Sequence, residues 1–127
     1  MTTYDDIRKI VSKLPGAIES EERFGYYVVN KGKEKGFLWL WNERIDPKKS
    51  RVPNPRVIAV IVRSLTEKDI ILGSDDGTKF FTEPHYNGFP AVLVRLDGVE
   101  PDDIEDLLIE AWKRKAPPSL VKEYEQL

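Results

Sequence analysis

His85 is the only histidine in the chain, and it lies in a short segment rich in turn-forming residues. An imidazole in such a place can serve as a general base or as a metal ligand. The chain has no second histidine and no cysteine, so an ordinary metal site lacks its other ligands. The structural alternative is that an imidazole nitrogen bonds a backbone carbonyl and holds the turn. We expect this structural role, with no catalytic residue, no metal site and no cofactor, and contact with a ligand stays open as the alternative.

The segment from Pro84 to Pro90 is predicted to form a fixed corner between two strands. Proline presets its own φ, and the Asn-Gly pair inside the segment tolerates positive φ. Loops on a rigid scaffold often carry binding groups. A cleft between this corner and a neighbouring hairpin would have Trp41, His85 and Tyr86 as its walls. These three residues are the candidate ligand-binding residues.

A second candidate site is a group of cations in the middle of the chain. Residues 31–63 contain nine basic and three acidic residues, whereas residues 97–127 contain four basic and nine acidic ones. Such asymmetry lets a chain with a net charge of −2 bind a polyanion through one face. The candidate nucleic-acid-binding residues are Lys31, Lys33, Lys35, Arg44, Lys48, Lys49, Arg51 and Arg56. The alternative is that these cations are solvated, discourage strand-edge pairing, or form surface ion pairs with Glu43 and Asp46.

An aromatic stripe lies beside these cations. Phe37, Trp39 and Trp41 alternate with Leu38 and Leu40, so strand geometry predicts one aromatic and one aliphatic face. Core packing is the default interpretation of such a stripe. Exposed rings next to positive charge would instead stack on single-stranded bases or on a planar small molecule.

Acidic residues gather between Asp97 and Asp106. Most of them open the strongest predicted helix, where negative charge offsets the positive end of the helix dipole. The spacing of a calcium loop is missing. We therefore interpret them as a helix start.

Length and composition set the broad class. A chain of 127 residues fits one domain, 1–127. The absence of cysteine excludes disulfides and thiolate chemistry and suits a reducing cytoplasm. The N-terminus lacks the features of a secretory signal, and no apolar run approaches the roughly 20 residues that cross a bilayer. We expect a cytoplasmic protein with no membrane partner, and the oligomeric state stays open.

Hydrophobic periodicity predicts the elements that position these residues. Helices are predicted from Thr3 to Leu14, over 65–72, from Pro101 to Ala116, and over 119–124. Strands are predicted over 24–29, 37–41, 57–62, 79–82 and 91–96. The segment 42–56 holds three prolines and is predicted to be a loop or an edge excursion. The pattern indicates an α+β fold: a mainly antiparallel sheet of about five strands, with an N-terminal helix, a short mid-chain helix and C-terminal helices packed on it.

Three motifs occur in order along nearly the whole chain. They are Leu14-Pro15-Gly16 with Glu19, the segment from Pro84 to Leu96, and Ala111-Trp112 with Ala116-Pro117 and Leu120. Together they resemble the MmcQ/YjbR-like family of small bacterial proteins, and residues 36–55 resemble a subgroup of it. The resemblance implies a compact α+β domain of the kind described as a double-wing, DNA-binding-like fold. It brings no catalytic residues.

Two functional hypotheses follow. The first is a non-enzymatic binding module that binds DNA through the basic hairpin and loop, without base specificity because no recognition helix carries a readable side-chain array. The alternative is a domain that binds a small ligand or a protein partner in the cleft at the corner.

Overall fold

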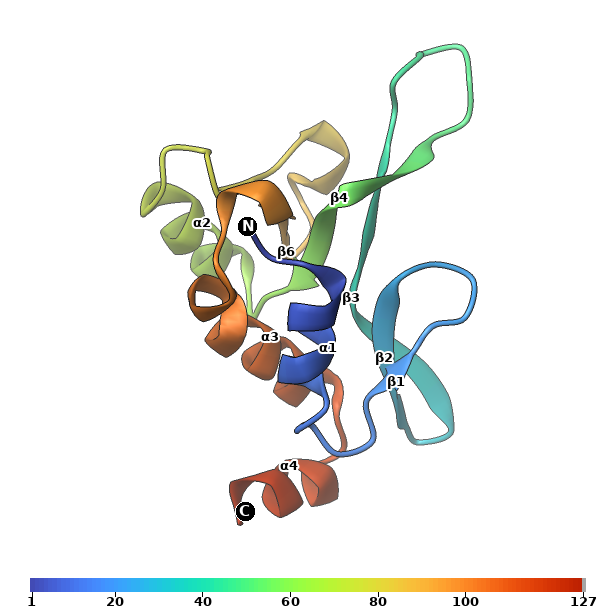
Figure 1. Ribbon diagram of the computed structural model, residues 1–127, viewed down its shortest axis with the longest axis vertical. Helices are drawn as coiled ribbons and strands as arrows, with labels where there is room; N and C mark the ends of the chain where they lie inside the picture. Colours follow the sequence, from blue (N-terminus) through green and yellow to red (C-terminus); the bar gives the residue numbers. More distant parts are fainter. Residues whose placement is uncertain (127) are drawn as a thin grey trace.

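The computed structural model describes residues 1–126 and contains one six-stranded antiparallel sheet with helices against it (Figure 1). The strands are β1 (Ile18–Glu19), β2 (Gly25–Asn30), β3 (Lys33–Glu43), β4 (Val52–Ile61), β5 (Phe80–Phe81) and β6 (Ala91–Arg95). Their order across the sheet is β1-β2-β3-β4-β6-β5. The helices are α1 (Tyr4–Val11), α2 (Leu65–Gly73), α3 (Pro101–Lys115) and α4 (Pro118–Glu125), with short 3-10 helices η1 (Pro84–Tyr86) and η2 (Leu96–Gly98). The predicted α+β class is confirmed.

Local sequence signals fix most helix starts. Thr3 forms a capping box with Asp6 at the start of α1. The side chain of Ser64 accepts a hydrogen bond from the Glu67 amide at the start of α2. Pro101 occupies the first turn of α3, as predicted for that position. The first helix ends at Val11, three residues before the predicted end at Leu14.

The prolines of the 42–56 segment do not exclude a strand. β4 begins at Val52, and Pro53 pairs with Asn42 of β3. β6 pairs with β4 only over residues 57–61, so at Pro53 the strand has a neighbour on one side only. The amide hydrogen that proline lacks is therefore not needed for a hydrogen bond to a second strand. The segment that was predicted to be a loop or an edge excursion is therefore partly strand, and β3 and β4 extend into it as a two-stranded ribbon on either side of a shorter loop.

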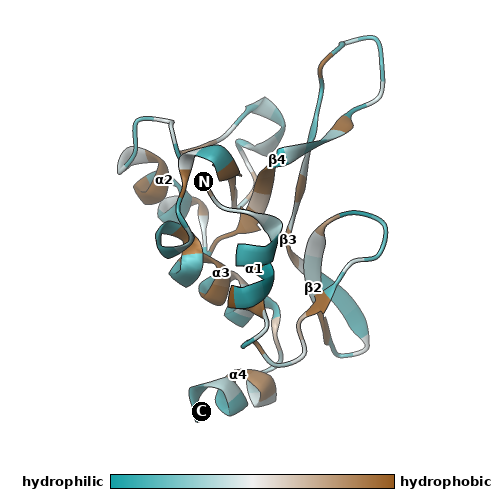
Figure 2. Ribbon diagram, in the orientation of Figure 1, coloured by the Kyte–Doolittle hydropathy of each residue, from teal (hydrophilic) through white to brown (hydrophobic). Residues whose placement is uncertain are grey.

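One face of the sheet packs against α1 and α3 to form the core. α1 and α3 lie together over β3 and β4 and turn their hydrophilic sides outward (Figures 1 and 2). Leu40, Ile58, Val94 and Phe80 are register partners in four successive strands and share this face. Trp112 of α3 is fully buried, and its indole Nε1 donates to the Pro15 carbonyl at 3.0 Å.

A β-bulge breaks the predicted aromatic face of β3. Tyr26 pairs with Leu38 and Tyr27 pairs with Gly36, which leaves Phe37 as an extra residue. Phe37 consequently joins the core side, where its ring stacks on that of Tyr26 at 6.3 Å between centroids. The prediction that Phe37 and Trp39 share a face is wrong, because the bulge shifts the alternation by one residue.

Trp39 lies on the opposite face of the sheet. Trp39, Ala59, Leu93 and Phe81 are register partners across β3, β4, β6 and β5, so their side chains point to the same side. The corner formed by Pro84–Pro90 lies over this second face. None of the described helices is both long enough and apolar enough to cross a membrane.

Candidate functional site

The corner at Pro84–Pro90 is built by successive short-range hydrogen bonds. The Tyr86 amide donates to the Glu83 carbonyl at 2.8 Å, and the Phe89 amide donates to the Tyr86 carbonyl at 3.0 Å. The Ala91 amide then donates to the Phe89 carbonyl at 2.8 Å, where β6 begins. The predicted corner between two strands is confirmed, and its first turn is η1.

An open cleft of about 400 Å³ lies beside the corner and is lined by Trp39, His85, Tyr86 and Phe89. The Trp39 indole Nε1 donates to the Tyr86 hydroxyl at 3.1 Å, which ties β3 to the corner. The Phe89 ring lies 6.3 Å from Trp39 and 6.0 Å from Tyr86 between centroids, at interplanar angles of 56° and 84°. Phe89 is 41% exposed, so one wall of the cleft faces solvent.

The corner is supported by Lys68 of α2, a residue that no sequence motif indicated. Lys68 is 2% exposed, and its ammonium donates to the carbonyls of Tyr86 and Phe89. The second of these bonds measures 2.9 Å. Burial lowers the pKa of Lys68, and the attraction of Asp69 and Glu83 opposes that shift. No carboxylate within residues 1–126 forms a salt bridge with this amine.

His85 does not hold the turn in the way that its position predicted. Its imidazole is exposed and makes no hydrogen bond within the described part of the chain. Its ring meets that of Tyr86 edge-on, with centroids 5.7 Å apart. The structural role expected of His85 is performed by Lys68, and His85 is a wall of the cleft.

Trp41 lies outside this cleft, although it was a candidate wall. Its ring packs against Phe81 at 5.5 Å and 82°. Its Nε1 is buried without an acceptor among the described residues, as is the Oε1 atom of Glu83 without a donor. Trp39 and Phe89 take the place that Trp41 was expected to fill, because Trp39 is the tryptophan that bonds to Tyr86 of the corner.

The candidate cations fall at two ends of β3 rather than on one continuous face. Lys31, Lys33 and Lys35 lie at the β2–β3 turn, where Lys31 and Gly32 have φ of 54° and 76°. These φ values are typical of the two-residue turns of tight hairpins. All three lysines are exposed, and none belongs to an ion pair within residues 1–126. They form one small basic tip.

The remaining candidates lie on or near the loop that joins β3 to β4, residues 44–51, which we call the arm. The arm projects away from the body of the protein (Figure 1). Lys48 and Lys49 are exposed on it. The Arg44 guanidinium donates to the carbonyls of Pro47 and Lys49 within the arm itself, the latter at 2.9 Å.

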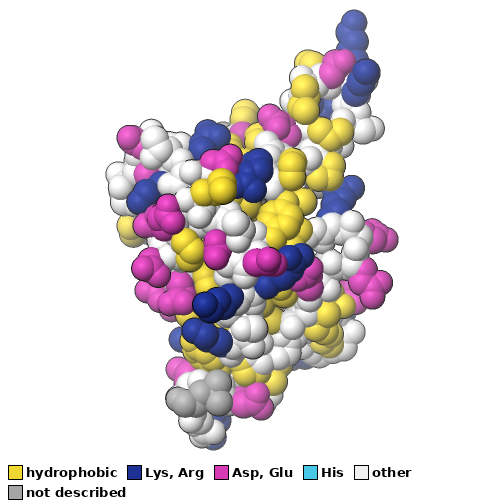
Figure 3. Space-filling model, in the orientation of Figure 1, with side chains coloured by type: hydrophobic (Ala, Val, Ile, Leu, Met, Phe, Trp, Pro, Cys, Tyr) yellow, Lys and Arg dark blue, Asp and Glu magenta, His cyan; other side chains and the backbone are white. Residues whose placement is uncertain are grey.

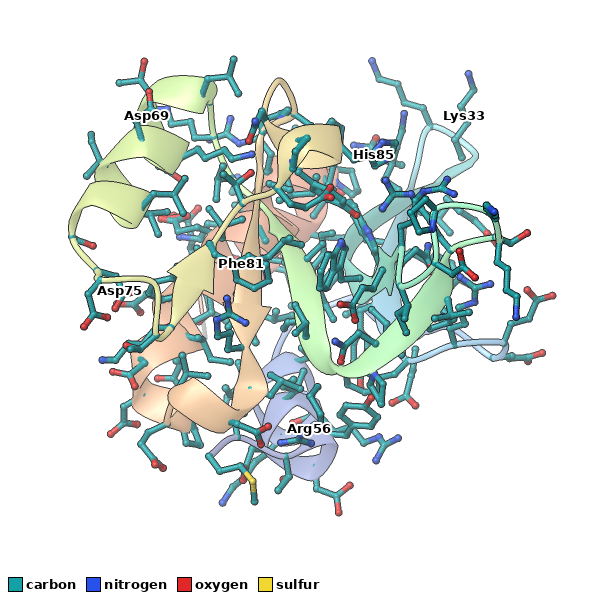
Figure 4. The ribbon with its side chains drawn as sticks, turned by 90° about the horizontal axis from the view of Figure 1, so that it is seen from above. Lys33, Arg56, Asp69, Asp75, Phe81 and His85 are labelled. Atoms are coloured by element: carbon teal, nitrogen blue, oxygen red, sulfur yellow. The ribbon has the colours of Figure 1, made fainter. Side chains whose placement is uncertain are left out.

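Two of the arginines are already engaged. Arg51 donates to the Asn42 carbonyl at 3.0 Å and lies 3.9 Å from a carboxylate oxygen of Glu83. Arg56 pairs with Asp97 at 2.6 Å beside α1, on the other side of the sheet from His85 (Figure 4). This pairing holds the pKa of Asp97 below its ordinary value. Neither arginine contributes a free charge to a common surface.

The described residues contain no group of three or more His, Cys, Asp or Glu side chains placed to hold a metal ion. Of the acidic residues after Asp97, Glu100 precedes α3 and Asp102 and Asp103 lie in its first turn, as predicted for a helix start, whereas Glu105 and Asp106 lie further along the helix. Asp103 accepts a hydrogen bond from the Glu100 amide at 2.8 Å, and this bond lowers its pKa.

Comparison with known proteins places the chain among relatives of similar length. No protein-family model matches it. The uncharacterized proteins Rv2570 and MT2646 of Mycobacterium tuberculosis and Mb2600 of Mycobacterium bovis are each 33% identical to it over 127 residues, which cover 98% of this chain and 96% of theirs. The crystal structure of the Deinococcus radiodurans protein DR2400, with the domain DUF419, has the same fold at a TM-score of 0.66 and 21% identity, covering 98% of this chain and 89% of that one. This chain belongs to the family of the mycobacterial proteins Rv2570, MT2646 and Mb2600.

Proposed function

We propose that the protein is a non-enzymatic binding module whose site is the aromatic cleft at the corner. The observation that carries the proposal is the set of four aromatic side chains around an open space of about 400 Å³, with Trp39 and Tyr86 tied to each other. Ligand sites are usually concave and largely apolar, with a few polar groups that orient the ligand. The His85 imidazole and the Tyr86 hydroxyl are the polar groups of this cleft.

The cleft suits a planar, largely apolar ligand or an aromatic side chain of a protein partner. Ring faces and edges offer stacking and edge-to-face contacts, which favour another ring. The Phe89 ring meets the rings of Trp39 and Tyr86 at steep angles, so a flat ligand that stacks on Phe89 would meet the other two rings at their edges. No carboxylate or hydroxyl bonds the His85 imidazole within residues 1–126, so the cleft lacks an assembled acid–base pair and we assign it no reaction.

Thermal-shift and tryptophan-fluorescence titrations with indole and with adenosine test this proposal. A ligand that binds only the folded state raises the melting temperature. We expect Phe89→Ala to weaken binding by about tenfold, because one stacked ring is lost. Ile70→Ala is the matched control, since Ile70 is 67% exposed and does not line the cleft. Equal affinities of wild type and Phe89→Ala would reject the cleft.

DNA binding is the second candidate function. It is favoured by the five lysines of the two hairpin ends, Lys31, Lys33, Lys35, Lys48 and Lys49, which are exposed and unpaired within residues 1–126. A basic hairpin can contact phosphates without reading sequence. The separation of the two ends along β3 argues against one continuous contact surface and makes this candidate the weaker one.

A salt-titrated fluorescence anisotropy assay with a labelled DNA duplex distinguishes the two functions. If the lysines contact phosphates, affinity falls steeply as salt rises. Joint replacement of Lys33, Lys35, Lys48 and Lys49 by alanine should then abolish binding. Unchanged affinity in that variant contradicts DNA binding through the hairpin ends and leaves the cleft as the site.

We also infer that the family of this chain is the MmcQ/YjbR-like family. The support is the order of its three motifs, two of which fall on elements of the structure. The segment from Pro84 to Leu96 forms the corner and β6, and Ala111-Trp112 lies on the buried side of α3. A sequence profile built from the mycobacterial relatives that fails to align with MmcQ/YjbR-like sequences at these motifs would contradict the inference.

A further inference from the structure

We propose that the arm, residues 44–51, docks into the groove between α2 and α3 of a second copy of this chain. This inference is independent of the proposed cleft function. It rests on three observations: an exposed apolar side chain on an ordered, basic arm, a groove with an apolar floor and free carboxylates, and the distance between the two on one molecule.

The arm presents Ile45 to solvent on an ordered loop. Ile45 is 73% exposed, which makes it the most exposed of the large hydrophobic side chains within residues 1–126. The loop is closed by Arg44, which donates to two arm carbonyls, and by the Lys49 amide, which donates to the Asp46 carbonyl at 3.0 Å. The Asp46 carboxylate accepts from the Lys48 amide at 2.9 Å, so it is used within the turn. Because the loop is ordered by its own bonds, little conformational entropy is lost when Ile45 is covered.

The groove between α2 and α3 has the complementary chemistry. Its main hollow, about 330 Å³, has a floor that includes the partly buried side chains Ile71, Phe80 and Leu107. Asp106 and Glu110 are exposed on its rim and form no ion pair within the described residues. The other two rim carboxylates are engaged: Asp103 pairs with Lys79 at 3.3 Å, and Glu67 accepts from the Arg63 amide at 3.1 Å. A smaller hollow, which Glu110 also lines, continues the groove toward the cations Arg63 and Arg114, so the end near Asp106 is the one that fits a basic partner.

The arm and the groove lie on opposite sides of the molecule. The arm projects at the upper right of Figure 1, and α2 lies at the left. Figure 3 shows basic side chains at the end of the arm and acidic side chains gathered over the far edge, where α2 and α3 lie. An arm therefore cannot fill the groove of its own chain, and the occupant is the arm of another copy. In the proposed contact, Ile45 packs against the apolar floor of the groove. Lys48 and Lys49 form ion pairs with Asp106 and Glu110.

The proposed interface is small, and we expect it to be weak. One arm in one groove buries less than the roughly 1,200 Å² at which stable complexes begin. Two copies that exchange arms double the contact and close a dimer, whereas a one-way contact extends into a chain of copies. Association should therefore depend on protein concentration and weaken as salt rises.

Sedimentation equilibrium of the full chain over a range of concentrations tests the proposal. We expect the wild type to associate reversibly, and we expect both Lys48→Glu with Lys49→Glu and Asp106→Lys with Glu110→Lys to reduce association at least tenfold. Mixing these two charge-reversed variants should restore association between unlike chains, because each supplies the surface that the other has lost. Lys31→Glu with Lys33→Glu is the matched control: it makes the same charge change at the other hairpin end and should leave association unchanged.

The outcomes show whether the arm binds a second copy of the chain or nucleic acid. All substituted side chains are exposed, and thermal unfolding confirms that each variant is folded. A wild type that stays monomeric at every concentration overturns the proposal, as does association that survives both charge reversals or a mixture that fails to restore it. If the wild type does not self-associate and the arm variant loses duplex DNA binding, the arm binds nucleic acid and not a second copy. That result also overturns the proposal.

Discussion

The corner at Pro84–Pro90 and the arm at residues 44–51 are both short, turn-rich loops next to the same sheet, but they are held in different ways. The corner bonds to distant elements: Lys68 of α2 donates to two of its carbonyls, and Trp39 of β3 donates to the Tyr86 hydroxyl. The hydrogen bonds of the arm stay within the arm and its ribbon, and its longer-range ion pair joins Arg51 to Glu83 at 3.9 Å. A loop anchored by long-range contacts can give a binding site a fixed shape, whereas a loop that is ordered mainly by its own bonds suits contact with another molecule.

The largest expected difference between the two loops is in their effect on stability. Lys68→Ala removes three buried methylenes and both corner hydrogen bonds, and we expect it to lower the free energy of unfolding by about 2–4 kcal/mol. Lys48→Ala, on the arm, should change it by no more than about 0.5 kcal/mol. Urea denaturation of the two variants measures both values. Similar losses in both would show that the corner is not anchored by Lys68.

The pH dependence of stability sharpens the role of the buried ammonium. Burial lowers the pKa of Lys68 in the folded protein below its ordinary value of 10.5, so the unfolded chain binds more protons in the interval between the two values. Stability should therefore rise through this interval as the pH increases toward 10.5. Comparison with Lys68→Met, which lacks the titrating group, isolates the contribution. A difference in unfolding free energy between wild type and Lys68→Met that stays constant up to this pH would contradict the proposed burial of the charged form.

Removal of the arm should have a much smaller effect on stability. Glu43 and Val52 are paired across the β3–β4 ribbon, so residues 44–51 can be replaced by an Asn-Gly turn that suits a two-residue hairpin. We expect the free energy of unfolding to change by less than about 1 kcal/mol, because the arm buries little apolar surface. Chemical denaturation with circular dichroism detects the change. A loss of several kcal/mol would mean that the arm supports the fold.

The smallest expected effect is that of Arg44→Ala. Its guanidinium bonds to two carbonyls of the arm, so its loss should loosen the arm and leave global stability within about 0.5 kcal/mol of wild type. Hydrogen exchange should become faster at the Lys49 amide, which bonds to the Asp46 carbonyl, and stay unchanged at the corner amides. Faster exchange at the corner would show that the two loops are coupled.

The sequence predicted the elements well where the signal was local. Capping at Thr3 and Ser64, proline at the start of α3, and the hydrophobic stripes gave helices and strands close to those observed. It predicted too few strands and too short a β4, because β1 is only two residues long and the proline-rich segment before residue 57 was predicted to be a loop or an edge excursion. A proline is tolerated there because its missing amide hydrogen faces no neighbouring strand, and strand neighbours are not readable from a single sequence.

The candidate site was predicted in part. The corner was correctly located, and His85 and Tyr86 do line a cleft. Trp39 replaces Trp41 because the corner lies over Trp39, whose indole bonds to the Tyr86 hydroxyl, whereas Trp41 packs against Phe81. The sequence did not indicate that Lys68 is buried, since a lysine on a short helix ordinarily points to solvent.

What the sequence determined by itself was the α+β class, the position of the corner and the segregation of charge along the chain, because each depends on residues close together in the sequence. Tertiary structure decided which rings line the cleft, which cations stay free, and that a buried amine from α2 replaces the histidine as the support of the corner. These outcomes depend on strand register and on the packing of distant elements, where a shift of one residue moves a side chain to the other face of the sheet.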